Sequence, residues 1–127
     1  RGVTLAILVP HISDHPFVKQ ASYPFLQTLY KKGATIYEYH NGFYHAKVLL
    51  IDDEICDLGT ANFDERSMKI NDEINCFIFD QEMIKRVKEV IDEDLNDSRK
   101  VTLDDLKAKS FGEWVQKGIA LLLTPYL

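Results

Sequence analysis

Residues 43–52 decide the fold, and they read Phe-Tyr-His-Ala-Lys-Val-Leu-Leu-Ile-Asp. The stretch is dense in strand formers, and its apolar residues from Val48 to Ile51 occupy both alternating faces. A strand that is apolar on both faces is buried on both sides, so we expect residues 43–51 to form a strand inside a sheet. Side chains two positions apart share a face of a strand, which places His45 and Lys47 side by side.

The segments before this strand predict a strand, a helix and a second strand. Residues 3–9 are an apolar run that ends at Pro10, as in a buried strand. Residues 17–29 carry apolar side chains at helical spacing, and Pro24 interrupts the pattern, which favours two short helices. Gly33 ends this helical region, and the β-branched and aromatic residues 35–39 predict the next strand.

The segments after it extend the sheet. A turn at residues 52–54 leads to an antiparallel strand at 55–58, and residues 74–79 predict a further central strand. Residues 59–71 are polar and irregular, whereas residues 82–97 form an amphipathic helix that packs on the sheet. The sequence therefore predicts an α/β fold, with a mixed β-sheet flanked by helices.

We expect two regions, a catalytic half at residues 1–100 and a helical carboxy-terminal tail at 101–127. Residues 102–105 resemble a helix-opening capping box, with Asp105 in place of the usual Glu or Gln. Residues 111–127 carry an apolar helical stripe that either packs on the domain's own core, the favoured interpretation, or seats the protein at a membrane surface. Because the sequence starts at Arg1, directly before a strand, we expect a fragment of a longer protein.

Composition limits the function classes. The chain has 127 residues, 46% of them hydrophobic, and a net charge of −5, which disfavours a nucleic-acid partner. Cys56 and Cys76 lie in predicted strands and are expected to be buried core thiols rather than a disulfide or a metal site. No stretch reaches the roughly 20 apolar residues of a membrane span, so this piece is expected to be soluble or peripheral.

The side chains of His45 and Lys47 suit phosphoryl chemistry. The ammonium group neutralises phosphate oxygens, and a neutral imidazole can attack phosphorus or move a proton. Thr60 and Asn62, which follow the predicted hairpin, add a hydroxyl and an amide that can bind further oxygens. This donor set needs neither a metal nor a cofactor.

The spacing His45-x-Lys47-x4-Asp52, followed by Gly59-Thr60-Ala61-Asn62, resembles the signature of the phospholipase D superfamily. The likeness continues through residues 63–67 to Asn71 and Glu73, and nearly the whole chain is similar to the carboxy-terminal half of bacterial cardiolipin synthases. Two positions depart from that pattern: Asp72 stands where we expect an aromatic residue, and Thr60 replaces the more usual Ser.

The resemblance implies a role for each matching residue. It makes His45 the catalytic histidine, Lys47 and Asn62 ligands of phosphate oxygens, and Thr60 the hydroxyl beside them. It makes Glu73 the carboxylate that orients the histidine. Asp52 matches the aspartate of the motif and is counted with the catalytic residues, yet a regular strand would place it on the face opposite Lys47, which favours a structural role at the strand end.

The resemblance also implies a reaction, in which two phosphatidylglycerol molecules give cardiolipin and glycerol through a phosphohistidine-type intermediate. Such a transfer uses two histidines, so this chain would supply half of a site and require an amino-terminal half of the same enzyme or a second copy. The parent enzyme would act at the bacterial cytoplasmic membrane on phospholipids, and the fragment alone would be inactive. The alternatives are a phosphodiester hydrolase of the same superfamily, either phospholipase or nuclease, and a noncatalytic phosphate-binding module.

Overall fold

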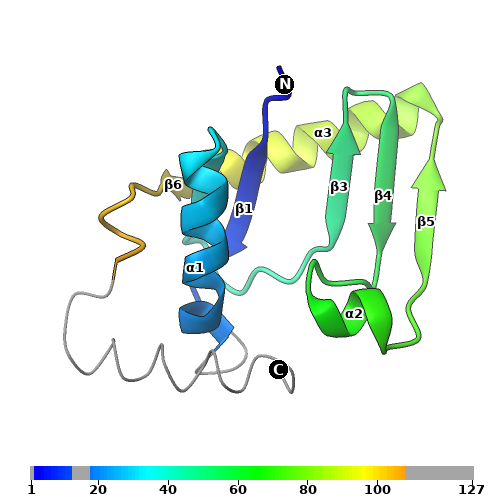
Figure 1. Cartoon of the computed structure of the whole chain (residues 1–127). Coiled ribbons are helices and arrows are strands. Elements are labelled where there is room, and N and C mark those ends of the chain that lie inside the picture. The colour runs from blue at the N-terminus through cyan, green and yellow to red at the C-terminus, as the bar shows by residue number, and fades with distance from the viewer. Residues whose placement is uncertain (1, 13–17, 108–127) are drawn as a thin grey trace. The chain divides into compact units, whose positions relative to one another are not determined.

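The computed structural model of the chain describes residues 2–12 and 18–107 (Figure 1). Contacts divide the chain into two units, one formed by residues 1–44 together with 97–127 and the other by residues 45–96. Each unit contains a three-stranded sheet. Both helices and sheets are present in the described residues, so the predicted α/β class is confirmed.

The first unit has a mixed sheet in the order β1-β2-β6, with strands at Ala6–Pro10, Thr35–Tyr39 and Ser98–Lys100. β2 pairs with β1 in parallel and with β6 in the antiparallel direction, and Glu38 lies opposite Arg99 in the β2–β6 register. The strand β6 was not expected from the sequence. It is only three residues long and polar, so it carries no strand pattern of its own and forms because β2 offers a free edge.

Helix α1 is continuous from Val18 to Lys31, so the expectation of two short helices was wrong. Pro24 removes one backbone donor inside the helix, but the helix bonds on either side of it persist. The helix ends as predicted at Gly33, whose φ of +98° lies in the left-handed region that favours glycine. The amide of Gly33 donates to the carbonyl of Tyr30 at 3.0 Å, and that of Ala34 to the carbonyl of Leu29 at 3.1 Å.

The core of the first unit joins α1, β2 and the segment that follows β6. Its buried residues are Leu26, Ile36, Val101 and Leu106. The Thr102–Asp105 pair makes both bonds of a capping box: the Thr102 amide donates to Asp105 Oδ2 at 2.9 Å and the Asp105 amide to Thr102 Oγ1 at 3.4 Å. The start of the predicted tail therefore packs into this unit, and residues 111–127 lie outside the described residues.

The second unit has an antiparallel sheet in the order β3-β4-β5, with strands at Val48–Ile51, Ile55–Gly59 and Asn75–Ile78 (Figure 1). β3 is shorter than the predicted strand at 43–51 and lies at an edge of this sheet, with Leu49 and Ile51 exposed, so the expectation of a strand buried on both faces was wrong. β5, expected to be a further central strand, lies at the other edge, and β4 is the middle strand. Apolar content alone does not determine which strands pair. Cys56 is fully buried as expected, whereas the prediction for Cys76 was wrong because this residue is exposed.

Two helices complete the second unit. α3 spans Gln81–Asn96, close to the predicted amphipathic helix, and buries Ile84. α2 spans Glu65–Lys69 inside the segment predicted to be irregular, and Asp64 caps it by accepting a hydrogen bond from the Ser67 amide at 2.7 Å. No helix within residues 2–12 and 18–107 is long and apolar enough to cross a membrane.

The first prediction concerns Gly59, where β4 ends opposite Asn75 of β5. A Cβ atom at this position would lie 2.4 Å from the carbonyl oxygen of Ile74 and 2.3 Å from Asn75 Oδ1. Because the first of these atoms belongs to the backbone, Gly59→Ala must force the two strands apart. We expect it to lower the free energy of unfolding by about 2 kcal/mol or more, measured by denaturant titration of the chain.

Gly42→Ala is the comparison variant. Unlike Gly59, Gly42 has a positive φ, +111°, and a Cβ atom there would meet no atom within 4 Å. This variant therefore carries backbone strain without a collision, whereas Gly59→Ala carries the collision without a positive φ. Equal losses of stability in the two variants would contradict the close-approach explanation.

Candidate active site

His45 and Lys47 lie at the start of the second unit, directly before β3. The Lys47 Nζ atom is 2.9 Å from both ring nitrogens of His45 and also donates to the His45 carbonyl oxygen at 3.0 Å. An ammonium group can only donate, so a ring nitrogen that accepts from it carries no proton. The predicted side-by-side arrangement of the two side chains is present, with His45 exposed to solvent and Lys47 half-buried.

Thr60 and Glu73 form the second part of the site. The Thr60 hydroxyl donates to Glu73 Oε2 at 2.6 Å and accepts from the Ile74 amide at 3.0 Å. The Thr60 amide in turn donates to the Ile74 carbonyl oxygen at 3.0 Å. Thr60 is thus held by the segment that leads into β5, and its hydroxyl is fixed against the carboxylate of Glu73.

The surroundings of Glu73 keep its carboxyl group ionised. Its pKa is lowered, first by the hydrogen bond from Thr60 and then by the hydroxyl of Ser67, with smaller contributions from Asn71 and from the positive charge of Lys47. Asn71 Nδ2 donates to Glu73 Oε1 at 3.3 Å. The positive charge of Lys47 makes the smallest of these contributions to the lowered pKa of Glu73.

Sequence reasoning overlooked Asn71 as a partner of Glu73, although Asn71 lies two positions before Glu73 in the same polar segment. The bonds to Glu73 described above come from Thr60 and Asn71, and the contact between Glu73 and His45 stays a prediction.

Asn62 and Asp52 lie in different parts of the second unit. Asn62 is exposed and follows Ala61, whose amide donates to Asn75 Oδ1 at 3.4 Å. Asp52 lies in the turn after β3, with a φ of 50°, so β3 separates it along the chain from His45 and Lys47. The neighbouring Asp53, with a φ of 55°, forms an ion pair with Lys88 of α3. This placement supports a structural role for Asp52.

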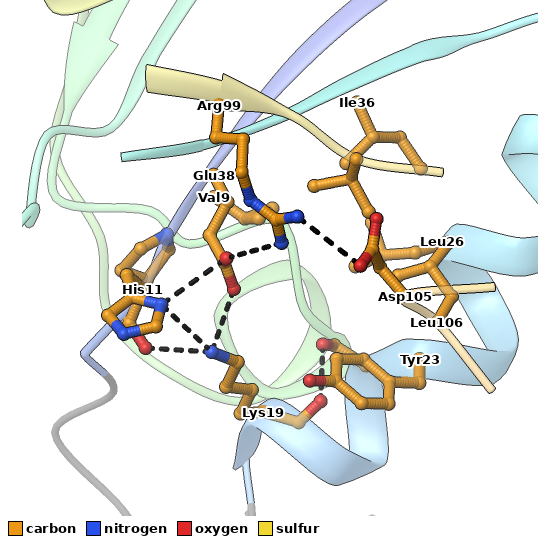
Figure 2. Close-up of a pocket in the computed structure, with 13 residues that line it drawn as sticks. Val9, His11, Lys19, Tyr23, Leu26, Ile36, Glu38, Arg99, Asp105 and Leu106 are labelled. Atoms are coloured by element: carbon orange, nitrogen blue, oxygen red, sulfur yellow. Dashed lines mark hydrogen bonds and ion pairs between the residues drawn. The ribbon is translucent and has the colours of Figure 1, made fainter. Parts of the chain in front are cut away.

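A second cluster of charged side chains lies in the first unit, in a pocket of about 320 Å³ beside α1 and β2 (Figure 2). At its centre is Glu38, whose side chain is only 11% exposed. Lys19 Nζ lies 2.7 Å from Glu38 Oε1, while His11 Nδ1 and Arg99 Nη2 lie 3.3 Å and 3.4 Å from Oε2. His40 Nε2 is 3.1 Å from the same oxygen.

His11, Glu38 and His40 offer three metal-ligating atoms within 4.8 Å of one another. Two features argue against a metal at this place. The rings of His11 and His40 are stacked, with centroids 4.2 Å apart and planes tilted by 27°, so their lone pairs lie in separate, nearly parallel planes, which is unfavourable for binding one ion. Lys19 and Arg99 already neutralise Glu38, and both would repel a cation. The cluster is better described as an ion-pair network that joins β1, α1, β2 and β6.

Comparison with known proteins identifies the class. The matching family is described as "Cardiolipin synthase, PLD-like domain", and the match covers residues 1–95. The chain belongs to this family of phospholipase D-like domains.

Individual relatives are cardiolipin synthases. The chain is 39% identical over 126 residues to the minor cardiolipin synthase ClsB of Bacillus subtilis, covering 96% of this chain and 32% of that protein. It is 40% identical to the major cardiolipin synthase ClsA of the same species, covering 99% of this chain and 26% of that protein. The cardiolipin synthase of Staphylococcus aureus gives the same three values, 40%, 99% and 26%. The chain thus spans between a quarter and a third of the length of these relatives.

The second prediction concerns the pH dependence that Glu38 gives to stability. Burial acts to raise the pKa of Glu38, but hydrogen bonds and charges from Lys19 and His11 outweigh it and lower the pKa from 4.5 to about 2. A lowered carboxyl pKa stabilises the folded state above the unfolded-state pKa, and this contribution is lost as the pH falls towards 2. We expect Glu38→Gln to cost about 2 kcal/mol at pH 7.

Chemical unfolding at several pH values measures this effect. The difference in stability between the original chain and Glu38→Gln should shrink as the pH falls from about 4.5 to about 2. Glu82→Gln is the control, because Glu82 forms an exposed ion pair with Arg86 one helical turn away and should change stability little. A difference between the original chain and Glu38→Gln that stays constant down to pH 2 would contradict the assignment.

Proposed function

We propose that this chain supplies one His-x-Lys half of a phosphatidyltransferase active site, which makes cardiolipin and glycerol from two phosphatidylglycerol molecules. The observation that carries the proposal is the placement of Lys47 Nζ against the imidazole of His45, with the charge of Lys47 also acting on Glu73. Membership of the phospholipase D-like family and the names of the relatives support the same reaction.

The transfer divides into two steps that share one proton. A histidine of the other half attacks phosphorus, and the bond from phosphorus to the departing glycerol oxygen breaks as His45 protonates that oxygen. In the second step His45 takes the proton from a hydroxyl of the second phosphatidylglycerol. That hydroxyl oxygen attacks phosphorus, the phosphorus–histidine bond breaks, and cardiolipin forms. A ring nitrogen of His45 that carries no proton can accept it in this second step.

The remaining residues stabilise charge. Lys47 and Asn62 bind the phosphate oxygens, whose negative charge increases in the transition state. Thr60 lies beside them, and its hydroxyl is already bonded to Glu73. Glu73 is kept ionised by its lowered pKa, so it can stabilise the imidazolium form of His45 and orient the ring. In this proposal Asp52 holds the β3–β4 turn and takes no part in the chemistry.

The second histidine comes from another part of the same polypeptide or from a second copy of this chain. The lipid substrates place the complete enzyme at the membrane surface. A phosphodiester hydrolase remains the second candidate, because water can replace the acceptor hydroxyl without changing any of these residues. The acidic net charge of −5 favours a lipid over a nucleic acid as the substrate of such a hydrolase.

The third prediction tests the two central residues. Phosphatidylglycerol turnover is measured in detergent micelles, with the chain alone and with the longest polypeptide that contains it. We expect the monomeric chain alone to be inactive. In the longer polypeptide, His45→Ala should abolish transfer, and Lys47→Ala should lower kcat about a hundredfold, because it removes a preorganised positive charge.

Lys85→Ala is the matched control for Lys47→Ala, because Lys85 is an exposed lysine of α3 in the same unit. It should leave turnover unchanged. Normal turnover in a folded His45→Ala protein would overturn the catalytic assignment. Products distinguish the candidate reactions, since a transferase releases cardiolipin and glycerol and a hydrolase releases phosphatidic acid and glycerol.

The fourth prediction concerns Glu73. Because its pKa is lowered from 4.5, Glu73 is ionised throughout the range from pH 5 to 9, and its titration should not shape the rate profile there. We expect Glu73→Gln to lower kcat by about tenfold to a hundredfold, the usual effect of removing an orienting carboxylate. Undiminished turnover in a folded Glu73→Gln protein would contradict the role of Glu73 in orienting the histidine.

A further inference from the structure

We infer that Asn75 and Asp57 form a positioning pair, which holds residues 59–62 against β5 and thereby sets where Asn62 meets a phosphate oxygen. This inference rests on the proposed function and adds two residues to it. Neither residue belongs to the His-x-Lys motif. Asp57 lies in the middle of β4, and Asn75 is the first residue of β5.

The side chain of Asn75 makes hydrogen bonds through both its NH₂ group and its oxygen. Its Nδ2 atom donates to the carboxylate of Asp57, at 2.8 Å from Oδ1 and 2.9 Å from Oδ2. Its Oδ1 atom accepts from the amide of Ala61 at 3.4 Å. The same Oδ1 atom would lie only 2.3 Å from a Cβ atom built on Gly59. The side chain of Asn75 therefore lies across Gly59, between the carboxylate on one side and the loop amide on the other.

Asp57 determines which way the amide group of Asn75 faces. If the amide were turned over, its oxygen would face the carboxylate and its NH₂ group would face the Ala61 N–H, so both contacts would become repulsive. The carboxylate accepts only from the NH₂ group, which leaves Oδ1 directed towards Ala61. The strand register allows this arrangement, because Gly59 is the direct partner of Asn75 and Asp57 lies two residues earlier on the same face.

The two anchors act on consecutive residues of the loop. Thr60 is held by the backbone of Ile74, and Ala61 is held by the side chain of Asn75. Asn62 is the next residue along the chain, so the residues directly before it are held in a fixed orientation. Asn75 and Asp57 act through Asn62 and touch no reacting atom, which makes them positioning residues. A misplaced ligand costs catalysis far more than an exposed hydrogen bond contributes to stability.

The experiment uses Asn75→Asp, Asp57→Asn and the double variant that exchanges the two side chains. Asn75→Asp places two carboxylates next to each other and should release the loop. We expect amide hydrogen exchange at Ala61 to accelerate about tenfold, with kcat for phosphatidylglycerol lowered by about tenfold or more and KM little changed. The double variant restores a carboxylate opposite an amide and should recover both the slow exchange and most of kcat.

Asn41→Asp is the matched control, because Asn41 Nδ2 donates to Asp97 Oδ2 at 2.8 Å in the other unit. It breaks the same kind of exposed contact and should leave Ala61 exchange and kcat unchanged. The inference is overturned if Asn75→Asp leaves Ala61 exchange unaltered, or if the double variant fails to recover kcat while remaining folded. Amide exchange is measured on the 127-residue chain without substrate, so it does not depend on turnover. Absence of turnover in the unmutated longer polypeptide would overturn the proposed function. Accelerated exchange at Ala61 in Asn75→Asp would still show that Asn75 holds the loop.

Discussion

The close approach of β4 and β5 at Gly59 is the constraint on which the candidate site depends. Opposite this glycine, the carbonyl oxygen of Ile74 and the side chain of Asn75 lie where any Cβ atom would collide with them. The approach lets Thr60 exchange hydrogen bonds with Ile74 and reach Glu73 with its hydroxyl. A glycine in a strand usually weakens packing, and here its missing side chain is what brings two site residues together.

The charged side chains of the two units differ in their burial and in their partners. In the first unit Glu38 is largely buried and surrounded by four basic side chains. Its ion pairs with these side chains link β2 to α1, to β6 and to the residue that follows β1. In the second unit the acidic and basic groups of the site are more exposed, and Glu73 is held by hydroxyl and amide donors with Lys47 as a more distant cation. The basic side chains around Glu38 are bound to its carboxylate, whereas those of the site lie near the surface where a substrate can reach them.

Local sequence patterns predicted the regular elements well where one face is apolar. The helix at Gln81–Asn96, the glycine stop at Gly33 and the strand at Thr35–Tyr39 were all expected, because each depends on interactions between residues close in sequence. The patterns did not reveal β6 or α2. The first forms only because β2 accepts an antiparallel partner, and the second begins at a capping side chain in a polar segment. Cys76 was predicted to be buried because it lies in a strand, but an edge strand of this sheet leaves it exposed.

The α/β class and the resemblance to phospholipase D-like proteins follow from the sequence alone, because both depend on residue types and their spacing along the chain. His45 and Lys47 lie side by side as predicted, but in the segment before β3 rather than on one face of a strand, so strand alternation does not account for their contact. Only the tertiary structure decided the partners of Glu73, the ion-pair network around Glu38 and the contact that joins Asp57, Asn75 and Ala61. The contacts of Glu73 with Thr60, of Glu38 with Arg99 and of Asp57 with Asn75 join residues far apart in sequence, so they depend on which strands pair and in which register.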